Sequence, residues 1–195
     1  MFVLDLYTKP LKQFFKKQHF MKKVFLAICI AAISATGYAQ KGTTKIGVGA
    51  DFGIPTGDFG EGFKTGFGGY AKGLFGIGEA GQITFTTGYS SFKAKGSTSD
   101  EKATWGIIPL LAGYRHNFSG FYAEPQVGYS INSAKVKVDG ISASSSEGAF
   151  AWAIGFGYVV KNVDFGARYQ SAHKDGGSIS LVGIHVGYNF SLGSK

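Results

Sequence analysis

Polarity alternates with a period of two residues along most of this chain, in stretches of about ten residues that begin near Thr44. Two residues is the side-chain period of a β-strand, and no window carries the i, i+3, i+4, i+7 apolar stripe of an amphipathic helix. The pattern therefore predicts an all-β chain. The first stretch places Ile46, Val48, Ala50, Phe52 and Ile54 on one face and Lys45, Gly47, Gly49, Asp51 and Gly53 on the other.

Seven further stretches bring the expected number of strands to eight. Five alternate clearly, over residues 82–90, 121–131, 150–158, 163–170 and 182–190. Two are weaker: one has Phe67, Ala71 and Phe75 on one face and Lys72 on the other, and the second covers residues 107–115. Pro109 lies inside the latter stretch and cannot donate to a strand ladder, but a bulge can hold a proline, so we expect a strand there as well.

The links between these strands alternate in length. Long links are expected at residues 55–65, 93–104 and 132–147, a medium one at 171–177, and short ones at 78–81, 117–120 and 161–162. This sorting is typical of an antiparallel up-and-down transmembrane barrel, with short periplasmic turns and longer extracellular loops. An even number of strands also returns both ends of the barrel to the same side of the membrane.

A spanning sheet must close on itself, because a bilayer offers no water to unpaired backbone groups. Side chains fill the interior of an eight-stranded barrel. We expect a plugged lumen in which opposite charges pair, formed by Lys45, Asp51, Lys72, Arg115, Glu124, Asp164, Arg168 and His185. Arg115 and Glu124 flank the same short link and share a face, so we expect them to be in contact.

Aromatic residues gather near both ends of the expected strands, which predicts two interfacial girdles. Tyr89, Tyr129, Trp152 and Tyr169 lie toward the long links, and Tyr114, Tyr158, Tyr188 and Phe190 lie toward the short ones. The alternative is the aromatic core of a soluble protein, which does not explain the gathering at both ends.

Residues 21–39 have the layout of a secretory signal peptide, with two lysines, about a dozen mostly apolar residues, and Gly37 and Ala39 before Gln40. The apolar run is too short to span a bilayer as a helix, although a retained anchor is the alternative. Residues 1–20 are either an extended basic region or follow a start codon assigned too early. We favour the second, because Met21 opens a complete signal.

The mature chain is therefore expected to be one domain, residues 40–195. Cys29 is the one cysteine, and bulky Ile28 before it argues against a lipoprotein. The domain thus has no cysteine for a disulfide or a thiolate metal site. Residues 1–39 hold six of the 20 basic and one of the 12 acidic side chains, which leaves 14 basic and 11 acidic residues, or +3, on the domain. Nucleic acid is not an expected partner.

Four segments resemble the outer-membrane β-barrel family of small, porin-like proteins of Gram-negative bacteria. They are Gly37–Gln40, Ile108–Arg115, Val163–Gln170 and Val186–Phe190, and the resemblance covers residues 40–195. It implies export to the periplasm, chaperoned delivery, insertion by the barrel assembly machinery, and residence in the outer membrane. The family shares no catalytic residues. The sequence departs from the usual ending because five residues follow Phe190.

We expect no catalytic, cofactor or metal site. The glycines of residues 76–81 have the spacing of a dinucleotide loop, but a strand is expected to follow and not a helix. Three histidines, His116, His173 and His185, do not cluster by sequence spacing. One enzymatic alternative acts on lipids or peptides at the extracellular rim, with His173 and Asp175 opposite Asp51 or Ser90.

Residues 134–143 alternate around Asp139 and Gly140, a strong hairpin signal, so the fifth and sixth strands are expected to protrude above the membrane as a ribbon. Such an edge can pair with an incoming strand. A solvated serine-rich loop is the alternative.

The predicted protein is a monomeric barrel with a structural or surface-interaction role, lipid as its surroundings, and an extracellular partner bound through its loops. The sequence leaves open a narrow solute pore. It also leaves open a soluble lipocalin-like barrel, which would need an apolar interior.

Overall fold

The computed structural model describes residues 43–97, 101–138, 141–174 and 177–192. The predictions for the leader, residues 1–39, and for Asp139, Gly140 and Asp175 lie outside these ranges.

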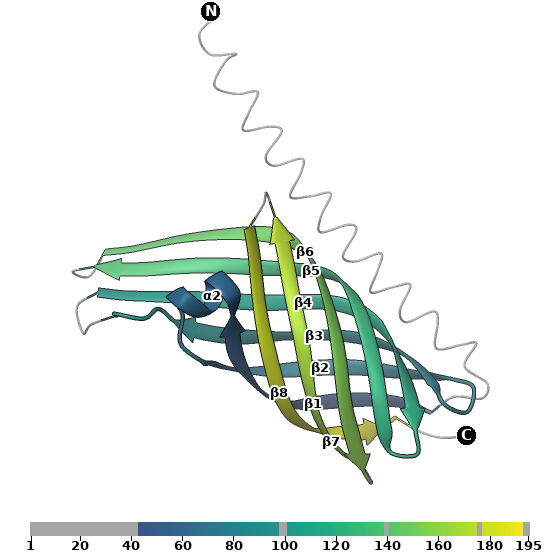
Figure 1. Ribbon diagram of the computed structural model, residues 1–195. Coiled ribbons are helices and arrows are strands. Elements are labelled where there is room, and N and C mark those ends of the chain that lie inside the picture. The colour runs from purple at the N-terminus through teal and green to yellow at the C-terminus, as the bar shows by residue number, and fades with distance from the viewer. Residues whose placement is uncertain (1–42, 98–100, 139–140, 175–176, 193–195) are drawn as a thin grey trace, which may run out of the picture. The chain divides into compact units, whose positions relative to one another are not determined.

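Eight antiparallel strands form a closed barrel in which each strand pairs with its neighbours in chain order (Figure 1). The pairing of β8 with β1 closes the barrel and runs from Lys45 opposite Ser191 to Thr56 opposite Ser180. The predicted all-β barrel is confirmed. The strands are β1 Thr44–Thr56, β2 Gly66–Ile77, β3 Gly81–Lys93, β4 Glu101–Phe118, β5 Phe121–Val138, β6 Ile141–Val160, β7 Val163–Lys174 and β8 Gly177–Ser191.

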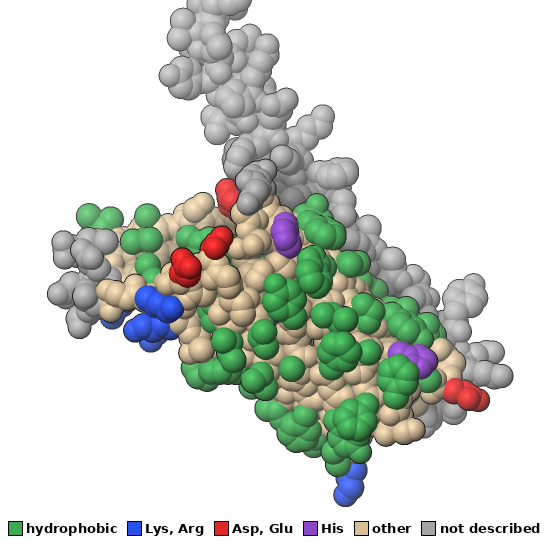
Figure 2. Space-filling view, in the orientation of Figure 1, with side chains coloured by type: hydrophobic (Ala, Val, Ile, Leu, Met, Phe, Trp, Pro, Cys, Tyr) green, Lys and Arg blue, Asp and Glu red, His purple; other side chains and the backbone are tan. Residues whose placement is uncertain are grey.

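The alternation of apolar and polar residues in the sequence corresponds to the outer and inner faces of the barrel wall. Apolar side chains cover the barrel wall, while charged side chains appear toward its two ends on the side seen in Figure 2. All eight expected girdle aromatics point outward, with between 37% and 60% of their surface exposed. The middle of the lumen is filled by buried charged, amide and hydroxyl side chains, so the described barrel has no continuous apolar interior of the lipocalin kind.

The short links are tight turns, as predicted. They lie between β2 and β3, β4 and β5, and β6 and β7, and they contain the left-handed residues Gly78, Ser119, Gly120 and Lys161. The amide of Leu192 donates to the carbonyl of Thr44 at 2.8 Å, so the two described ends of the barrel meet at the same side.

The long link at 132–147 and the medium link at 171–177 were predicted wrongly, because the strands continue through them. β5 and β6 remain paired as far as Val138 opposite Ile141, and β7 and β8 as far as Lys174 opposite Gly177. The ribbon is therefore confirmed in place of the solvated loop. Above the membrane both faces of a strand meet water, so the alternation of polarity that marks a strand in the sequence fades there.

The predicted strand around Pro109 is confirmed as part of β4, and it passes the proline without a bulge. Ile107 pairs with Ser90 and Leu110 pairs with Thr87, so two residues lie between these pairs on each strand and the register is unchanged. On the other side Pro109 lies opposite Ser130. The missing N–H removes one donor from the ladder but inserts no residue.

The first long link contains a helix, α2 Gly57–Gly62, that the sequence did not predict. Its six residues are too few for an apolar stripe to show as a periodic pattern. Phe59 is the buried residue of α2, and it packs in the barrel mouth with Phe92 of β3 at 5.4 Å between ring centroids. Thus α2 lies over the end of the barrel that carries the longer links.

Candidate functional site: the lumen plug and the extracellular rim

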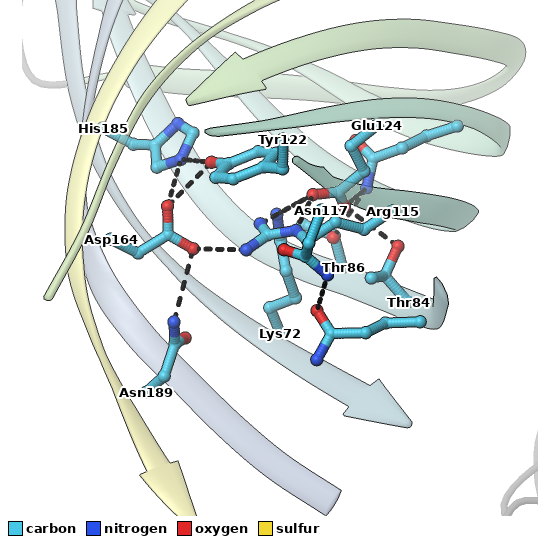
Figure 3. Close-up of polar contacts among 12 residues, drawn as sticks. Lys72, Thr84, Thr86, Arg115, Asn117, Tyr122, Glu124, Asp164, His185 and Asn189 are labelled. Carbon is cyan, nitrogen blue, oxygen red and sulfur yellow. Dashed lines mark hydrogen bonds and ion pairs between the residues drawn. The ribbon is translucent and has the colours of Figure 1, made fainter. Parts of the chain in front are cut away.

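Arg115 occupies the centre of the lumen and contacts two carboxylates on opposite sides (Figure 3). Its Nε donates to Glu124 Oε2 at 2.8 Å, and its Nη1 donates to Asp164 Oδ2 at 2.8 Å. The predicted contact between Arg115 and Glu124 is confirmed. All three side chains are at most 2% exposed, so these ion pairs have left water almost completely.

Glu124 also binds groups from strands that are not its neighbours. Lys72 Nζ of β2 donates to Oε2 at 2.9 Å, and Thr84 Oγ1 of β3 donates to Oε1 at 2.9 Å. Gln126 of the same strand donates to Oε1 at 2.8 Å. These bonds satisfy both carboxylate oxygens, which offsets the cost of burying the charge.

Asp164 has a matching set of partners on the other side of the guanidinium. Tyr122 donates its hydroxyl to Oδ1 at 2.7 Å, and Asn189 donates to Oδ2 at 3.5 Å. The Nε2 of His185 lies 3.6 Å from Oδ1. The Arg115 guanidinium also lies 3.6 Å from the centroid of the Tyr122 ring, a cation–π contact.

A second ion pair lies nearer the rim, where Arg168 Nη2 donates to Asp51 Oδ2 at 2.7 Å. The buried cations Lys72, Arg115 and Arg168 thus balance the buried anions Asp51, Glu124 and Asp164. Lys45, which we also assigned to the lumen, is only partly buried at the turn end.

The lumen is a plug, since the cavity among these residues measures only about 10 Å³, room for no more than one water. Apolar residues close the mouth above it. Phe59, Phe92, Ile107 and Leu181 form a buried cluster against which Phe63, Trp105 and Ile179 pack. Sequence reasoning missed this cluster, although Phe92 and Ile107 have inward parity.

The residues proposed for a rim enzyme are not assembled. Asp51 is bound to Arg168, and His173 contacts Ser171 at 3.4 Å. A cavity of about 320 Å³ opens at the mouth, but none of His173, Ser90 and Asp51 lines it. The fourth predicted residue, Asp175, lies outside the described residues.

The three histidines of the domain lie in separate surroundings. His116 bonds Tyr114 at 3.1 Å at the turn end, and His185 bonds Tyr122 at 3.1 Å in the lumen. Among the described residues no three His, Cys, Asp or Glu side chains could hold a metal ion together. The glycine-rich residues 76–81 form the turn into β3, so no helix follows them.

The extracellular rim is uneven. The β6–β7 ladder ends where Phe150 pairs with His173, whereas β5 and β6 stay paired up to Val138 and Ile141. Figure 1 shows β5 and β6 reaching well beyond the barrel at the end where α2 lies. We call this part, residues 133–138 and 141–146, the ribbon.

A closed eight-stranded barrel with an apolar outer wall, two aromatic girdles and a charged plug defines a small integral membrane protein that crosses a bilayer with its strands. Among the described residues no helix is long and apolar enough to cross a membrane. A family model, the outer membrane protein beta-barrel domain, matches residues 25–190. The chain belongs to that family, and it is an outer-membrane protein of a Gram-negative bacterium.

Solved structures share the fold at low sequence identity. The attachment invasion locus protein Ail of Yersinia pestis, solved with the heparin analogue sucrose octasulfate, has a TM-score of 0.62 at 17% identity over 77% of this chain and 99% of Ail. Neisserial surface protein A has a TM-score of 0.54 at 18% identity over 76% and 97%. The N-terminal barrel of OprF from Pseudomonas aeruginosa has 0.53 at 12% over 77% and 100%. No curated protein matches significantly.

Proposed function

We propose that this chain is a monomeric surface-interaction protein, adhesion-like in role, whose ribbon binds an extended segment of an extracellular partner protein. The observation that carries the proposal is the edge of β6. In the described part of the chain, residues 141–149 of β6 pair with β5 on one side and have no strand on the other. Their backbone groups on that side are available to an added strand.

The composition of this edge favours strand addition. Proteins usually protect an exposed edge with proline, with lysine or with a bulge. Residues 141–149 consist of Ile, Ser, Ala, Gly and a single charged residue, Glu147, so no proline or lysine blocks this edge. Small side chains also let another backbone approach closely.

The comparisons support a surface role without naming a partner. Ail is an attachment protein by name, and its structure holds a heparin analogue, while the neisserial protein is named as a surface protein. We also propose that the barrel neither conducts solutes nor catalyses a reaction, and the filled lumen supports this. In this proposal the barrel serves to anchor and orient the ribbon at the membrane surface.

The test compares full-length chains displayed on a non-adherent laboratory Gram-negative host. In one variant Asn-Gly replaces residues 135–144, so that Ala134 and Ser145, which are paired in the parent, are joined by a tight turn. We expect cells with the parent chain to attach to a cultured epithelial monolayer, and the short-ribbon variant to attach several-fold less. Equal attachment at equal surface display would exclude the ribbon as the binding element.

A matched control separates shape from charge, because the deletion also removes two lysines. Lys135→Gln with Lys137→Gln keeps the β6 edge and its length. If strand addition is the mode of binding, this control attaches like the parent. Loss of attachment in the control alone would replace strand addition with electrostatic binding.

A further inference from the structure

The mouth cavity of about 320 Å³ lies beside the free edge of β6. Strands β6 and β7 stay paired as far as Phe150 opposite His173, and β7 pairs with β8 up to Lys174. The cavity opens where β6 and β7 part. Its lining comes from β4, β5 and β6 on one side, with Trp105, Asn132, Ala134, Ser145, Glu147 and Ala149, and from β7 and β8 on the other, with Ala172, Lys174, Gly177, Ser178 and Ile179.

A strand added to the free side of β6 would continue the line of β7 beyond His173, away from the membrane. Side chains of an added strand alternate between the two faces of the sheet, whether the strand runs parallel or antiparallel to β6. Ser145 and Glu147 have the inward parity of Ala149. A residue of the added strand directly opposite either of them would therefore point its side chain into the cavity.

The cavity has a buried, mostly apolar floor and an exposed polar rim. Ala149 and Ala172 are buried at the floor, and Ile179 is half-buried. The exposed lining side chains are Ser145, Glu147, Lys174 and Ser178. Glu147 and Lys174 form an ion pair at 2.9 Å in which both side chains are largely in water. A pair as exposed as this contributes little stability, so an entering side chain can displace it at small cost.

Two polar groups of the lining have unused hydrogen-bonding capacity among the described residues. The indole N–H of Trp105 is buried and has no acceptor there. The buried Asn132 amide accepts from Ser130 Oγ at 3.2 Å and donates to the Ser130 carbonyl at 3.3 Å, which uses one N–H and one lone pair and leaves one of each. A hydroxyl can serve both groups, since it accepts and donates. Tyrosine carries a hydroxyl on a large apolar ring, whereas phenylalanine has no polar atom and tryptophan no acceptor.

We propose that this cavity is a specificity pocket for a tyrosine side chain on the extended segment that adds to β6. The inference rests on the proposed function, because the segment must lie along β6 for its side chain to enter. The ring packs on Ala149, Ala172 and Ile179, and the hydroxyl bonds Trp105 and Asn132. Main-chain bonds to β6 give affinity, and the pocket selects the sequence. The volume is at the lower end of the range for binding pockets, about 300–1,000 Å³.

The test uses heptapeptides with an N-terminal fluorescein and the full-length chain in a nonionic detergent, with binding measured by anisotropy. The tyrosine probe is Thr-Val-Thr-Tyr-Thr-Val-Thr, and its matched controls carry phenylalanine or alanine at the central position. We expect the alanine probe to bind at least about tenfold more weakly, because it buries no ring. The phenylalanine probe should bind a few-fold more weakly than the tyrosine probe, because it lacks the hydroxyl.

Two chain variants add the same side chain on opposite faces of β6. Ala149→Leu fills the cavity from its floor, whereas Gly148→Leu lies on the outward face, where a Cβ meets nothing within 4 Å. We expect Ala149→Leu to weaken the tyrosine probe by at least about tenfold, since leucine takes the space of the ring. Gly148→Leu should keep the parent affinity. Equal effects of the two variants would overturn the pocket, and unchanged heat-dependent electrophoretic mobility shows that each is folded.

Tryptophan fluorescence gives a second readout that needs no change in the cavity. The chain has two tryptophans, so Trp152→Phe on the outer wall leaves Trp105 as the remaining one. The emission of Trp105 should change when the unlabelled tyrosine probe binds and should stay constant with the alanine probe at equal saturation. Constant emission with bound tyrosine probe would overturn the assignment.

The short-ribbon variant separates failure of the pocket from failure of strand addition, because it retains every residue that lines the cavity. If both proposals hold, it binds the tyrosine probe more weakly than the parent does. Equal affinities of the tyrosine and alanine probes for the parent, both weakened in the short-ribbon variant, would overturn the pocket alone. Tyrosine-probe binding that is unchanged by the short ribbon but lost in Ala149→Leu would overturn strand addition. Absence of binding by every probe would overturn both.

Discussion

Arg115 and Glu124 face each other across strands β4 and β5 and are joined twice, from Nε to Oε2 at 2.8 Å and from Nη2 to Oε2 at 2.7 Å. This pair is the centre of a network that links β2, β3, β4, β5, β7 and β8 through the lumen. Buried charges of this kind add little net stability, but the loss of one partner leaves another uncompensated.

Glu124→Gln should destabilise the barrel strongly. The variant keeps the shape of the side chain but leaves Lys72 and Arg115 without the carboxylate that both contact. We expect the free energy of unfolding to fall by about 3–5 kcal/mol. The measurement is urea unfolding from lipid vesicles, followed by tryptophan fluorescence.

Glu147→Gln is the matched control for that experiment. It removes an ion pair with Lys174 in which the side chains are 63% and 41% exposed. An exposed pair contributes about 0–1 kcal/mol. If both variants lost the same stability, the network would not be the element that holds the barrel together.

Val127→Arg tests the assignment of the outer wall to lipid. Val127 is 57% exposed near the middle of the apolar part of β5. A charge there should cost roughly 2–4 kcal/mol and impair assembly, measured as the fraction of chain that resists unfolding in unheated electrophoresis samples. Ser133→Arg, on the same face but beyond the apolar rows, should assemble normally. Similar losses in both would mean that the two positions do not differ in depth.

Gln126→Arg, at the neighbouring inward position, is a less clean control. From the sequence alone we expect it to be tolerated better than Val127→Arg. The side chain of Gln126 is buried and donates to Thr86 and to Glu124, each at 2.8 Å. Gln126→Arg therefore disturbs the plug, in addition to testing which residues of β5 face the lumen.

Gly157→Ala and Gly155→Ala form a matched pair on the inner face of β6. A Cβ on Gly157 would collide with the carbonyl of Phe165 and the hydroxyl of Tyr122, whereas a Cβ on Gly155 meets nothing closer than 3.7 Å. We expect Gly157→Ala to lose about 1–3 kcal/mol of stability in urea unfolding. Gly155→Ala should be neutral or slightly stabilising, because glycine costs entropy in a strand. If Gly155→Ala lost more stability than Gly157→Ala, the Tyr122 side chain would be able to move away from a Cβ at position 157.

The barrel should conduct almost no ions. The lumen cavity of about 10 Å³ and the apolar cluster above it leave no continuous water path through the described barrel. Single-channel recording in planar bilayers should therefore show no stable openings for the parent chain. Regular conductance steps would favour the narrow solute pore over the plugged anchor.

Several features of the barrel could be predicted from local sequence because the strand period is local. Alternation assigned Val127 to lipid and Glu124 to the lumen, and the structure confirms both. The contact between Arg115 and Glu124 was also predictable, since the short turn between β4 and β5 limits the register of their strands.

Contacts between distant strands could not be predicted. Lys72 reaches Glu124 over 52 residues, and Arg168 reaches Asp51 over 117 residues. These contacts exist only because the sheet closes with one particular register around the ring. Pairing in a neighbouring register would move every such side chain to the opposite face.

What the sequence by itself determined is the parity of each strand, the number of strands and the chemistry of the two faces. Those properties follow from the spacing of apolar residues within about ten positions. The tertiary structure alone decided which lumen charges meet, how far β5 and β6 extend, and that Lys102 faces Lys137. Closure and register are properties of the whole ring, because each strand position is fixed by both neighbours at once.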